Sequence, residues 1–238
     1  NFTLVHDDIM DSDDTRRNVP TVHKKYDVPS AILAGDGIFT ISQLILGTIQ
    51  NNSNHLLQKY NEMVLEICEG QALDKQFEGE DKLNLDDYIE MVKKKTGALL
   101  GACLSLPAII SHENSEKINE LYDAGKSLGV GFQIHDDIFE IFGEESVIGK
   151  SLGSDISSNK NTAIAIVAKE RNKVDWSNLT NQFDGKDLYK IRKFLEENNV
   201  KTKVENIADS YFLSAFNSLK NLEIDEKNEL YGFFKMIQ

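Results

Sequence analysis

A short acidic motif occurs twice in this chain of 238 residues. Residues 6–11 read His-Asp-Asp-Ile-Met-Asp, and residues 135–140 read His-Asp-Asp-Ile-Phe-Glu. In a helix, residues three and four positions apart share a face, so each copy places three carboxylates on one turn. Such crowding is unfavourable unless positive charge lies among the carboxylates. Because Mg²⁺ binds carboxylates together with substrate phosphates, two matching copies predict facing walls of a site for metal ions and a diphosphate.

The hydrophobic periodicity is helical along nearly the whole chain. The pattern predicts helices over residues 29–50, 54–77, 86–110, 115–142, 161–170, 187–198, 203–219 and 225–237. No alternation of strands with helices is present, which argues against a Rossmann or P-loop architecture. The sequence therefore predicts an all-α helical bundle, with the two acidic motifs on different helices around one central cavity.

Several local expectations accompany these helices. The segment 29–50 is strongly apolar and is expected to be a central helix, whereas the polar segment 172–186 is expected to be a surface connection. The segment 143–161 is predicted to be an ordered loop. Asn84 or Asp86 is expected to cap one helix, and Ser115 another, because short polar side chains accept hydrogen bonds from the first turn.

The bulk composition limits the classes of function. A hydrophobic content of 40% and the lack of a Pro/Gly/Ser-rich linker indicate one domain over residues 1–238. The net charge of −13 speaks against nucleic acid as a partner. Cys68 and Cys103, the only cysteines, indicate a reducing, cytoplasmic compartment and no zinc site. The apolar run 97–110 is too short to span a bilayer, which takes about 20 residues, so no transmembrane segment is expected.

Two arginines follow the first acidic motif closely. Arg16 and Arg17 suit oxyanions, because guanidinium groups match phosphate oxygens in a bidentate manner. The alternative is an exposed loop in which Asp14 and Arg17 neutralise each other. Proximity to the carboxylates of the first motif favours phosphate binding.

These residues resemble the trans-isoprenyl diphosphate synthase (polyprenyl synthetase) family. Residues 4–11, continued by 13–17 and 20–23, look like the first aspartate-rich motif of that family, and residues 131–137, continued by 149–156, look like the second. Between them, Ala34-Gly35-Asp36, Gly70-Gln71 with Asp74, and Lys95-Thr96-Gly97 follow in the expected order. The resemblance covers about the first two-thirds of the chain.

The resemblance implies a Mg²⁺-dependent condensation, with Mn²⁺ as the alternative ion. An allylic diphosphate ionises to a carbocation, isopentenyl diphosphate attacks it, and a proton is lost. The implied metal ligands are the carboxylates of the two motifs, Asp7, Asp8, Asp11, Asp136, Asp137 and Glu140. The implied catalytic residues are Lys95, Thr96, Gln133 and Lys160. Diphosphate binding is implied for Arg16, Arg17, Lys95, Gln133, Lys150 and Lys160. A homodimer is also implied.

Some of these residues also have a purely structural interpretation. Lys95 closes the run Lys93–Lys95, and such a run is ordinarily a solvated helix face. Gln133 on a helix could be a satisfied polar group of the core.

The chain also departs from the family pattern. Glu140 replaces the usual aspartate, and Asn18 and Asn159 replace usual glycines. A longer side chain at position 140 can still reach a metal ion. The amino-terminal helices with their glycine-lysine-arginine motif are not in this chain, so isopentenyl diphosphate would be poorly held unless preceding residues supply it.

The residues before the first motif bear on product length. In this family they form the floor of the tunnel in which the product grows. A bulky Phe2 five positions before Asp7, followed by a small Thr3, resembles the archaeal-type geranylgeranyl diphosphate synthases. The resemblance therefore implies a C20 product, and ordinary core packing is the alternative role for Phe2.

Three other functions compete with prenyl elongation. A class I terpene cyclase also ionises an allylic diphosphate, but its second metal motif needs a hydroxyl where this chain has Ile141. A non-catalytic subunit of a heteromeric prenyl synthase would not need both acidic motifs to be intact. A helical protein with two acidic surface turns would make the arginine pair and the ordered motifs accidental.

Overall fold

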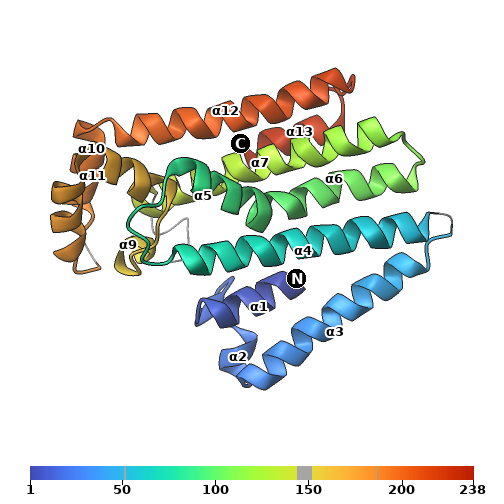
Figure 1. The fold of residues 1–238 in the computed structure, drawn as a ribbon, viewed down its shortest axis with the longest axis horizontal. Coiled ribbons are helices and arrows are strands. Elements are labelled where there is room, and N and C mark those ends of the chain that lie inside the picture. The colour runs from blue at the N-terminus through green and yellow to red at the C-terminus, as the bar shows by residue number, and fades with distance from the viewer. Residues whose placement is uncertain (51, 144–151, 186) are drawn as a thin grey trace. The chain divides into compact units, whose positions relative to one another are not determined.

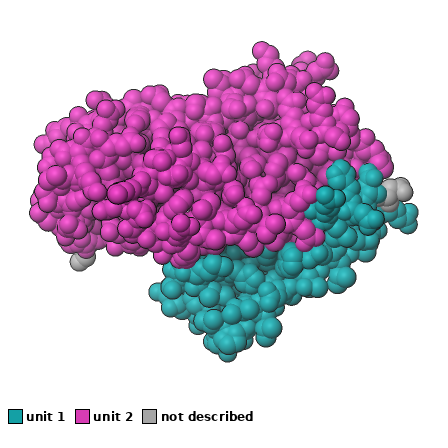
Figure 2. Space-filling view, in the orientation of Figure 1, with its two compact units in different colours: residues 1–58 teal, residues 59–238 magenta. Residues whose placement is uncertain are grey.

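The computed structural model describes residues 1–50, 52–143, 152–185 and 187–238. These residues form two compact units, residues 1–58 and residues 59–238 (Figure 2). Helices dominate both units, and the strands of the described residues form one two-stranded sheet. The prediction of an all-α fold is confirmed.

Unit 1 carries the first acidic motif on a short helix. Its elements are α1 (Phe2–Met10), β1 (Thr15–Arg16), β2 (Val19–Pro20), α2 (Val22–Lys25), α3 (Val28–Gly47) and the first residues of α4 (Ser53–Phe77). Helix α1 packs on α3. The imidazole of His6 lies so close to Gly35 that a Cβ atom there would overlap it, with 2.1 Å to Nε2. Glycine in α3 therefore allows the helix with the acidic motif to approach closely.

Strands β1 and β2 form a short hairpin after the first acidic motif. Thr15 pairs with Pro20 and Arg16 with Val19 in antiparallel register. Arg17 and Asn18 connect them with φ angles of 54° and 62°. A two-residue hairpin loop with both φ values positive matches the right-handed twist of the strands, and asparagine tolerates this conformation better than most residues. Asparagine at position 18 is thus a conformational substitute for the usual glycine.

Helix α3 is apolar but not buried, contrary to the expectation of a central helix. Only Ala31 and Gly35 along it are buried, whereas Leu33 and Leu44 are 71% and 66% exposed. By length and composition alone, this helix of 20 residues could cross a membrane, because its most apolar stretch has a mean hydropathy of 1.4. Only 11% of that stretch is buried. The expected lack of a transmembrane segment stays a prediction.

Unit 2 is built around the long helix that carries the second acidic motif. Its elements are the rest of α4, α5 (Leu85–Val92), the π-helical segment η1 (Lys93–Gly97), α6 (Ala98–Ile110), α7 (Ser115–Phe142), α9 (Ser154–Ser157), α10 (Ala163–Asn181), α11 (Tyr189–Glu197), α12 (Val200–Asn221) and α13 (Glu229–Ile237). Helix α7 packs against both α6 and α12 (Figure 1). Leu128, Ile134 and Phe212 are fully buried in this core.

The two expected helix caps in unit 2 have different outcomes. Asn84 caps α5 in a reciprocal capping box with Asp87, as predicted. Helix α7 is capped by Asn114, which accepts from Lys117 N at 2.8 Å, so the predicted Ser115 cap was wrong by one residue. Either side chain can fill the role, and the backbone conformation at the helix entry decides between them.

The predicted surface connection 172–186 was also wrong. Helix α10 continues to Asn181 after a break at Asn172, whose φ and ψ angles are −158° and 91°. Trp176 in this continuation is buried and packs against Phe194 at a ring separation of 5.9 Å. One large aromatic side chain anchors a segment whose other residues are mostly polar, which a hydropathy pattern does not detect.

Candidate active site

The carboxylates of the first motif gather around one guanidinium group. Arg16 Nε donates to Asp8 Oδ1 at 2.6 Å, and Arg16 Nη2 lies 3.8 Å from Asp7 Oδ2 and 3.7 Å from Asp13 Oδ2. The hairpin turns the chain back so that Arg16 reaches α1. Asp8 is buried, so its charge needs this partner. Because the motif lies at the C-terminal end of α1, where the helix dipole is negative, repulsion between the carboxylates is greatest there.

The residues after Arg16 are held by a separate set of contacts. Lys24 Nζ lies 2.8 Å from Asp14 Oδ1, so Asp14 pairs with Lys24 and not with Arg17. The hydrogen bond and charge of Lys24 lower the pKa of Asp14. Thr21 Oγ1 donates to Asp13 O at 2.7 Å. Arg17, at the tip of the hairpin, is exposed.

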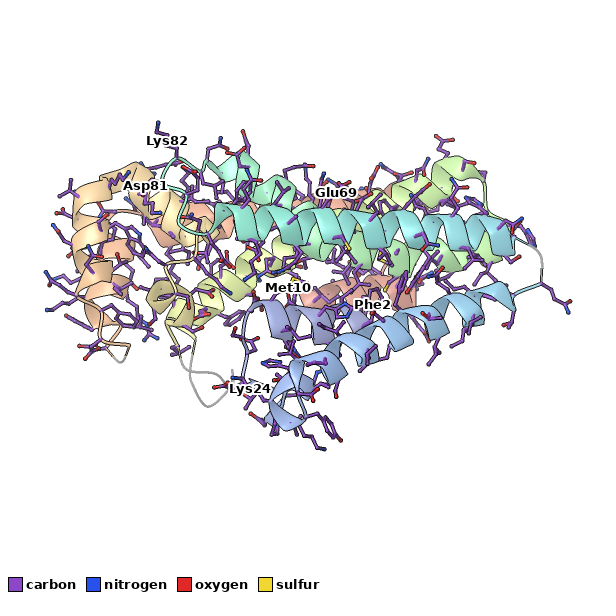
Figure 3. All side chains as sticks on the ribbon, turned by 60° about the horizontal axis from the view of Figure 1, so that its bottom comes forward. Phe2, Met10, Lys24, Glu69, Asp81 and Lys82 are labelled. Carbon is purple, nitrogen blue, oxygen red and sulfur yellow. The ribbon has the colours of Figure 1, made fainter. Side chains whose placement is uncertain are left out.

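Phe2 lies at the opposite end of α1 from the acidic residues. Figure 3 labels Phe2 and Met10, which mark the two ends of that helix. The ring of Phe2 packs against Phe39 of α3 with 5.3 Å between centroids. Thr3 follows on the same helix. The aromatic pair lies within unit 1.

In the second motif, Asp137 is buried and held by neutral donors. Tyr88 OH donates to Asp137 Oδ2 at 2.6 Å, and Ala163 N donates to the same oxygen at 3.0 Å. Gln133 Nε2 donates to Asp137 Oδ1 at 3.4 Å. Burial raises the pKa of Asp137 to about 7 against the lowering effect of the Tyr88 hydrogen bond. Asp136, the preceding residue, is exposed.

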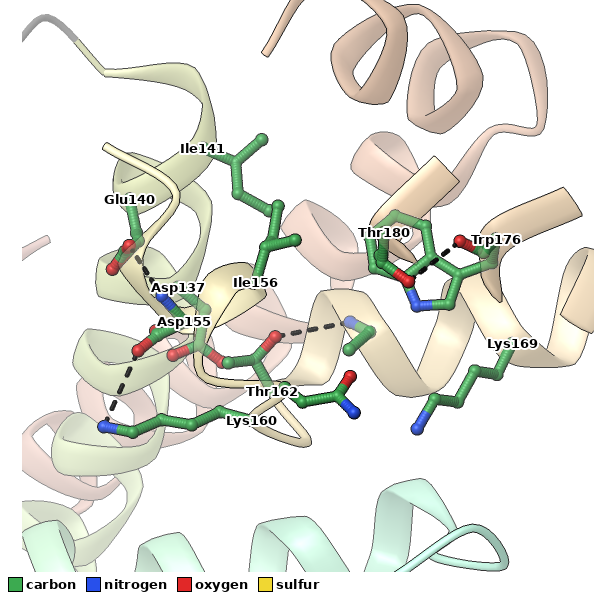
Figure 4. A pocket seen from close by; sticks show the side chains of 12 residues that line it. Asp137, Glu140, Ile141, Asp155, Ile156, Lys160, Thr162, Lys169, Trp176 and Thr180 are labelled. Carbon is green, nitrogen blue, oxygen red and sulfur yellow. Dashed lines mark hydrogen bonds and ion pairs between the residues drawn. The ribbon is translucent and has the colours of Figure 1, made fainter. Parts of the chain in front are cut away.

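Glu140 joins the end of α7 to the short helix α9. Glu140 Oε1 accepts from Ser154 Oγ at 2.9 Å. It also accepts from Asp155 N at 3.0 Å, and Figure 4 shows Glu140 beside Asp155. The side chain thereby satisfies an amide in the first turn of α9, and its extra methylene gives it the reach. Glutamate at this position therefore has a structural use in this chain. Metal binding by Asp136, Asp137 and Glu140 stays a prediction.

Two lysines of η1 contact acidic residues of α4. Lys95 Nζ lies 2.5 Å from Asp74 Oδ2, and Lys94 Nζ lies 2.8 Å from Glu69 Oε2. A Cβ atom at Gly70 would come within 2.3 Å of Lys95 N, so glycine is what permits this approach of η1 to α4. A π-helical turn inserts an extra residue into a helix and is frequent at functional sites. The three-lysine run is thus not a purely solvated face.

Lys95 lines a pocket of unit 2 together with other predicted site residues. Thr96 Oγ1 donates to Gln133 Oε1 at 3.1 Å, so two residues far apart in sequence meet there. Lys160 Nζ lies 3.6 Å from Asp155 Oδ1. The pocket is lined by Asp74, Phe77, Glu78, Tyr88, Met91, Val92, Lys95, Thr96, Gln133, Asp137, Asp155, Lys160, Asn161 and Thr162. The structure brings Lys95, Thr96, Gln133, Asp137 and Lys160 together, whereas Lys150 lies outside the described residues.

Asn159, just before Lys160, has a φ angle of 56°. Glycine adopts this left-handed conformation most readily, and asparagine is among the few other residues that accept it. The departure at position 159 therefore preserves the backbone turn that precedes Lys160. The next residue, Asn161, donates through Nδ2 to Phe77 O and Glu80 O at 2.8 and 2.9 Å, which ties this segment to the end of α4.

Sequence reasoning missed the contribution of Tyr88 and Asn161, and it placed Asp155 in the second motif without giving it a role. Tyr88 occupies an apolar position of α5, and its hydroxyl gave no signal because a buried tyrosine is common in helical cores. The partners of Tyr88 and Asn161 lie far away along the chain, at positions 137 and 77. Only the folded chain reveals such pairings.

The oxygen atoms of the first motif suit a divalent cation. Within the described parts of the chain, no three His, Cys, Asp or Glu side chains are grouped as a metal centre. In the first motif, however, Asp7 and Asp8 already surround the cationic guanidinium of Arg16. Hard carboxylate oxygens that attract a cation fit Mg²⁺ or Mn²⁺ better than softer metals.

Comparisons with known proteins agree with these features. The polyprenyl synthetase family matches residues 1–205. A geranylgeranyl pyrophosphate synthase of Geoglobus acetivorans is 44% identical over 173 residues, covering 71% of this chain and 54% of the relative. A geranylgeranyl diphosphate synthase of Sulfolobus acidocaldarius is 33% identical over 241 residues, covering 97% of this chain and 72% of the relative. The chain spans about half the length of the first of these relatives.

Solved structures of similar proteins have the same fold. A solved geranylgeranyl pyrophosphate synthase superposes with a TM-score of 0.92 at 30% identity, covering 99% of this chain and 76% of that one. The solved enzyme of G. acetivorans gives a TM-score of 0.86 at 35% identity, with the same coverage. The chain thus has the all-α fold of these solved synthases. The chain belongs to the polyprenyl synthetase family.

Proposed function

We propose that this protein is a chain-elongating trans-prenyltransferase that condenses isopentenyl diphosphate with an allylic diphosphate. The observation that carries the proposal is the pair of aspartate motifs, each at the C-terminal end of a helix, in a member of the polyprenyl synthetase family. In the first motif the carboxylates surround Arg16, and the pocket beside the second contains Lys95 and Lys160. Carboxylates next to fixed cations suit a metal-bound diphosphate.

The metal ion would be held by the acidic motifs. Asp7, Asp11 and Asp136 would bind Mg²⁺ or Mn²⁺, with Asp8, Asp137 and Glu140 as neighbouring carboxylates. When bound, the metal ions withdraw charge from the diphosphate and make it a better leaving group.

The basic residues of this chain would stabilise the charge that develops during ionisation. As the C–O bond of the allylic diphosphate breaks, its electron pair leaves with the diphosphate. Arg16, Lys95 and Lys160 would place fixed positive charge beside that group. Arg17, exposed at the tip of the hairpin, and Lys150 would bind diphosphate, Arg17 that of isopentenyl diphosphate.

The remaining steps take place around the carbocation. Thr96 and Gln133 would present polar oxygens near it. The double bond of isopentenyl diphosphate forms the new C–C bond, and the released diphosphate accepts the proton that is lost. We treat both compact units as parts of one prenyl synthase domain over residues 1–238, located in the cytoplasm, where the exposed thiols of Cys68 and Cys103 would stay reduced.

The first test is turnover by the complete polypeptide, including any residues before Asn1. Isopentenyl diphosphate, Mg²⁺ and allylic primers from C5 to C15 are supplied, and the dephosphorylated products are separated by chromatography. A ladder of longer prenols is expected. Hydrocarbon formed without isopentenyl diphosphate would instead indicate a cyclase. Tight binding of a diphosphate analogue with Mg²⁺ but no elongation would indicate a non-catalytic subunit.

We also propose that the product is geranylgeranyl diphosphate. The Phe2 ring, supported by Phe39, would close the tunnel for the growing chain. In the variant Phe2→Ala, removal of the ring is expected to lengthen the main product by at least one C5 unit. Thr3→Ser, which keeps a small side chain, is the matched control. An unchanged C20 end point in Phe2→Ala would exclude Phe2 as the floor.

A homodimer is the last part of the proposal. It is supported by the exposed apolar side chains of α3, among them Leu33, Ile41, Leu44 and Ile45, which a second copy would cover. Light scattering of the complete protein is expected to give twice the chain mass. Leu44→Glu, which places a charge on this face, is expected to shift the protein toward the monomer. A monomeric parent protein would refute the dimer.

A further inference from the structure

One carboxylate oxygen in unit 2 joins three helices. Asp137 Oδ2, on α7, accepts from Tyr88 OH of α5 at 2.6 Å and from Ala163 N at the start of α10 at 3.0 Å. Tyr88 and Asp137 are 3% and 5% exposed. A distance of 2.6 Å lies at the short end of the range for O–H···O hydrogen bonds. The Tyr88 hydroxyl therefore holds a buried carboxylate in one orientation.

The other oxygen of Asp137 accepts a hydrogen bond from a residue that lines the pocket. Gln133, one helical turn earlier on α7, donates through Nε2 to Asp137 Oδ1 at 3.4 Å. Its Oε1 accepts from Thr96 Oγ1 at 3.1 Å. The nitrogen end of the Gln133 amide thus faces Asp137. The carbonyl end of Gln133 is then left to face Thr96.

We propose that Tyr88 is a positioning residue for prenyl transfer, because it fixes Asp137, and Asp137 fixes which end of the Gln133 amide faces Thr96. This inference rests on the proposed function, in which Thr96 and Gln133 lie beside the carbocation. A carbonyl oxygen turned to the cation stabilises it, whereas an amide nitrogen in its place would oppose it. Tyr88 thereby influences the reaction from 45 residues before Gln133 in the sequence.

The type of residue at position 88 suits this role. The buried hydroxyl of Tyr88 donates to Asp137 and so has the hydrogen-bond partner that a buried polar group needs. A buried hydroxyl without a partner would cost free energy that phenylalanine avoids. Tyr88 is buried on α5, as are Ile89 and Val92 of the same helix. The position therefore needs an aromatic body and a donor at its tip.

The kinetic test compares two tyrosine-to-phenylalanine variants of the complete protein. Tyr122, on α7, is 6% exposed and does not line this pocket, so Tyr122→Phe is the matched control. Loss of the hydroxyl in Tyr88→Phe is expected to lower kcat by about tenfold to a hundredfold, the usual range for residues that orient a functional group. The KM of each diphosphate is expected to change by less than about threefold, because no substrate contact is removed. Equal kcat values in Tyr88→Phe and Tyr122→Phe would overturn the inference.

A double-mutant cycle tests whether Tyr88 acts through Asp137. If it does, adding Tyr88→Phe to Asp137→Asn is expected to lower kcat by less than about threefold further, because coupled residues are not additive. A full additional tenfold loss would show that Tyr88 acts by another route and would refute the inference. Thermal unfolding of each variant confirms that the folded protein is being compared.

The parent protein, the two single variants Tyr88→Phe and Asp137→Asn, and the double variant also separate this inference from the proposed function. In urea unfolding, Tyr88→Phe and Asp137→Asn are expected to show a coupling of about tenfold in the unfolding constant, which does not depend on turnover. A parent protein that couples in this way but does not elongate prenyl chains would refute the proposed function, and the positioning role with it. An elongating parent protein without coupling in stability or kcat would refute only the role of Tyr88.

Discussion

The two acidic motifs have nearly the same sequence, yet the structure neutralises them differently. In unit 1, Arg16 brings a full positive charge to Asp7, Asp8 and Asp13. In unit 2, the carboxylate of Asp137 is held by neutral donors, Tyr88 and Ala163 among them. A guanidinium compensates the charge itself, whereas neutral hydrogen bonds only partly offset the loss of water. The same six-residue pattern thus gives two electrostatic environments.

The largest expected effect concerns pH and Asp137. Its pKa of about 7 in the folded chain exceeds the ordinary value of 3.8, so folding favours the protonated form. The unfolding free energy should therefore fall as pH rises through this interval, by up to about 4 kcal/mol once the group is ionised. Asp137→Asn removes this dependence. Urea unfolding of both proteins at about pH 5 and about pH 8, in metal-free buffer, measures the difference.

The exposed Asp209 of α12 provides the control for that experiment. Asp209→Asn should leave the pH dependence of stability as in the parent protein. A stability difference between Asp137→Asn and the parent that is the same at both pH values would contradict the raised pKa. It would also remove the electrostatic contrast between the two motifs.

A somewhat smaller loss of stability is expected in unit 1. Arg16→Ala leaves the buried charge of Asp8 without its guanidinium partner, which should lower the unfolding free energy by about 3 kcal/mol. Arg17→Ala, at an exposed neighbouring position, should change it by less than about 0.5 kcal/mol. Urea unfolding of both variants gives the comparison. Equal losses would mean that Arg16 does not neutralise the motif.

The smallest effect concerns the end of the second motif. Glu140→Ala removes the acceptor for Ser154 Oγ and Asp155 N, which is expected to destabilise the start of α9 by about 1 kcal/mol. Hydrogen exchange at the Asp155 amide should accelerate about fivefold. Glu140→Asp tests the need for the longer side chain and should give part of the same acceleration. An unchanged exchange rate in Glu140→Ala would show that Glu140 does not hold α9.

The sequence predicted the features that depend on local chemistry. Helical periodicity gave the bounds of α4 within one residue, because the apolar face of a helix is written at three- and four-residue spacing. It failed where one side chain decides the structure, as Trp176 does in the second half of α10. It also misjudged α3, since an apolar composition indicates that a surface can be covered but not what covers it.

By itself, the sequence determined the helical class, the family and the identity of the acidic and basic residues of the candidate site. Only the tertiary structure decided what each carboxylate contacts. The hairpin returns Arg16 to Asp8, and the packing of α5 and α10 on α7 brings Tyr88 and Ala163 to Asp137. These partners come from elements that fold together over long sequence separations. Hydrogen bonds and charges act over a few ångströms in space, and a repeated motif carries no record of which distant residues will lie within that range.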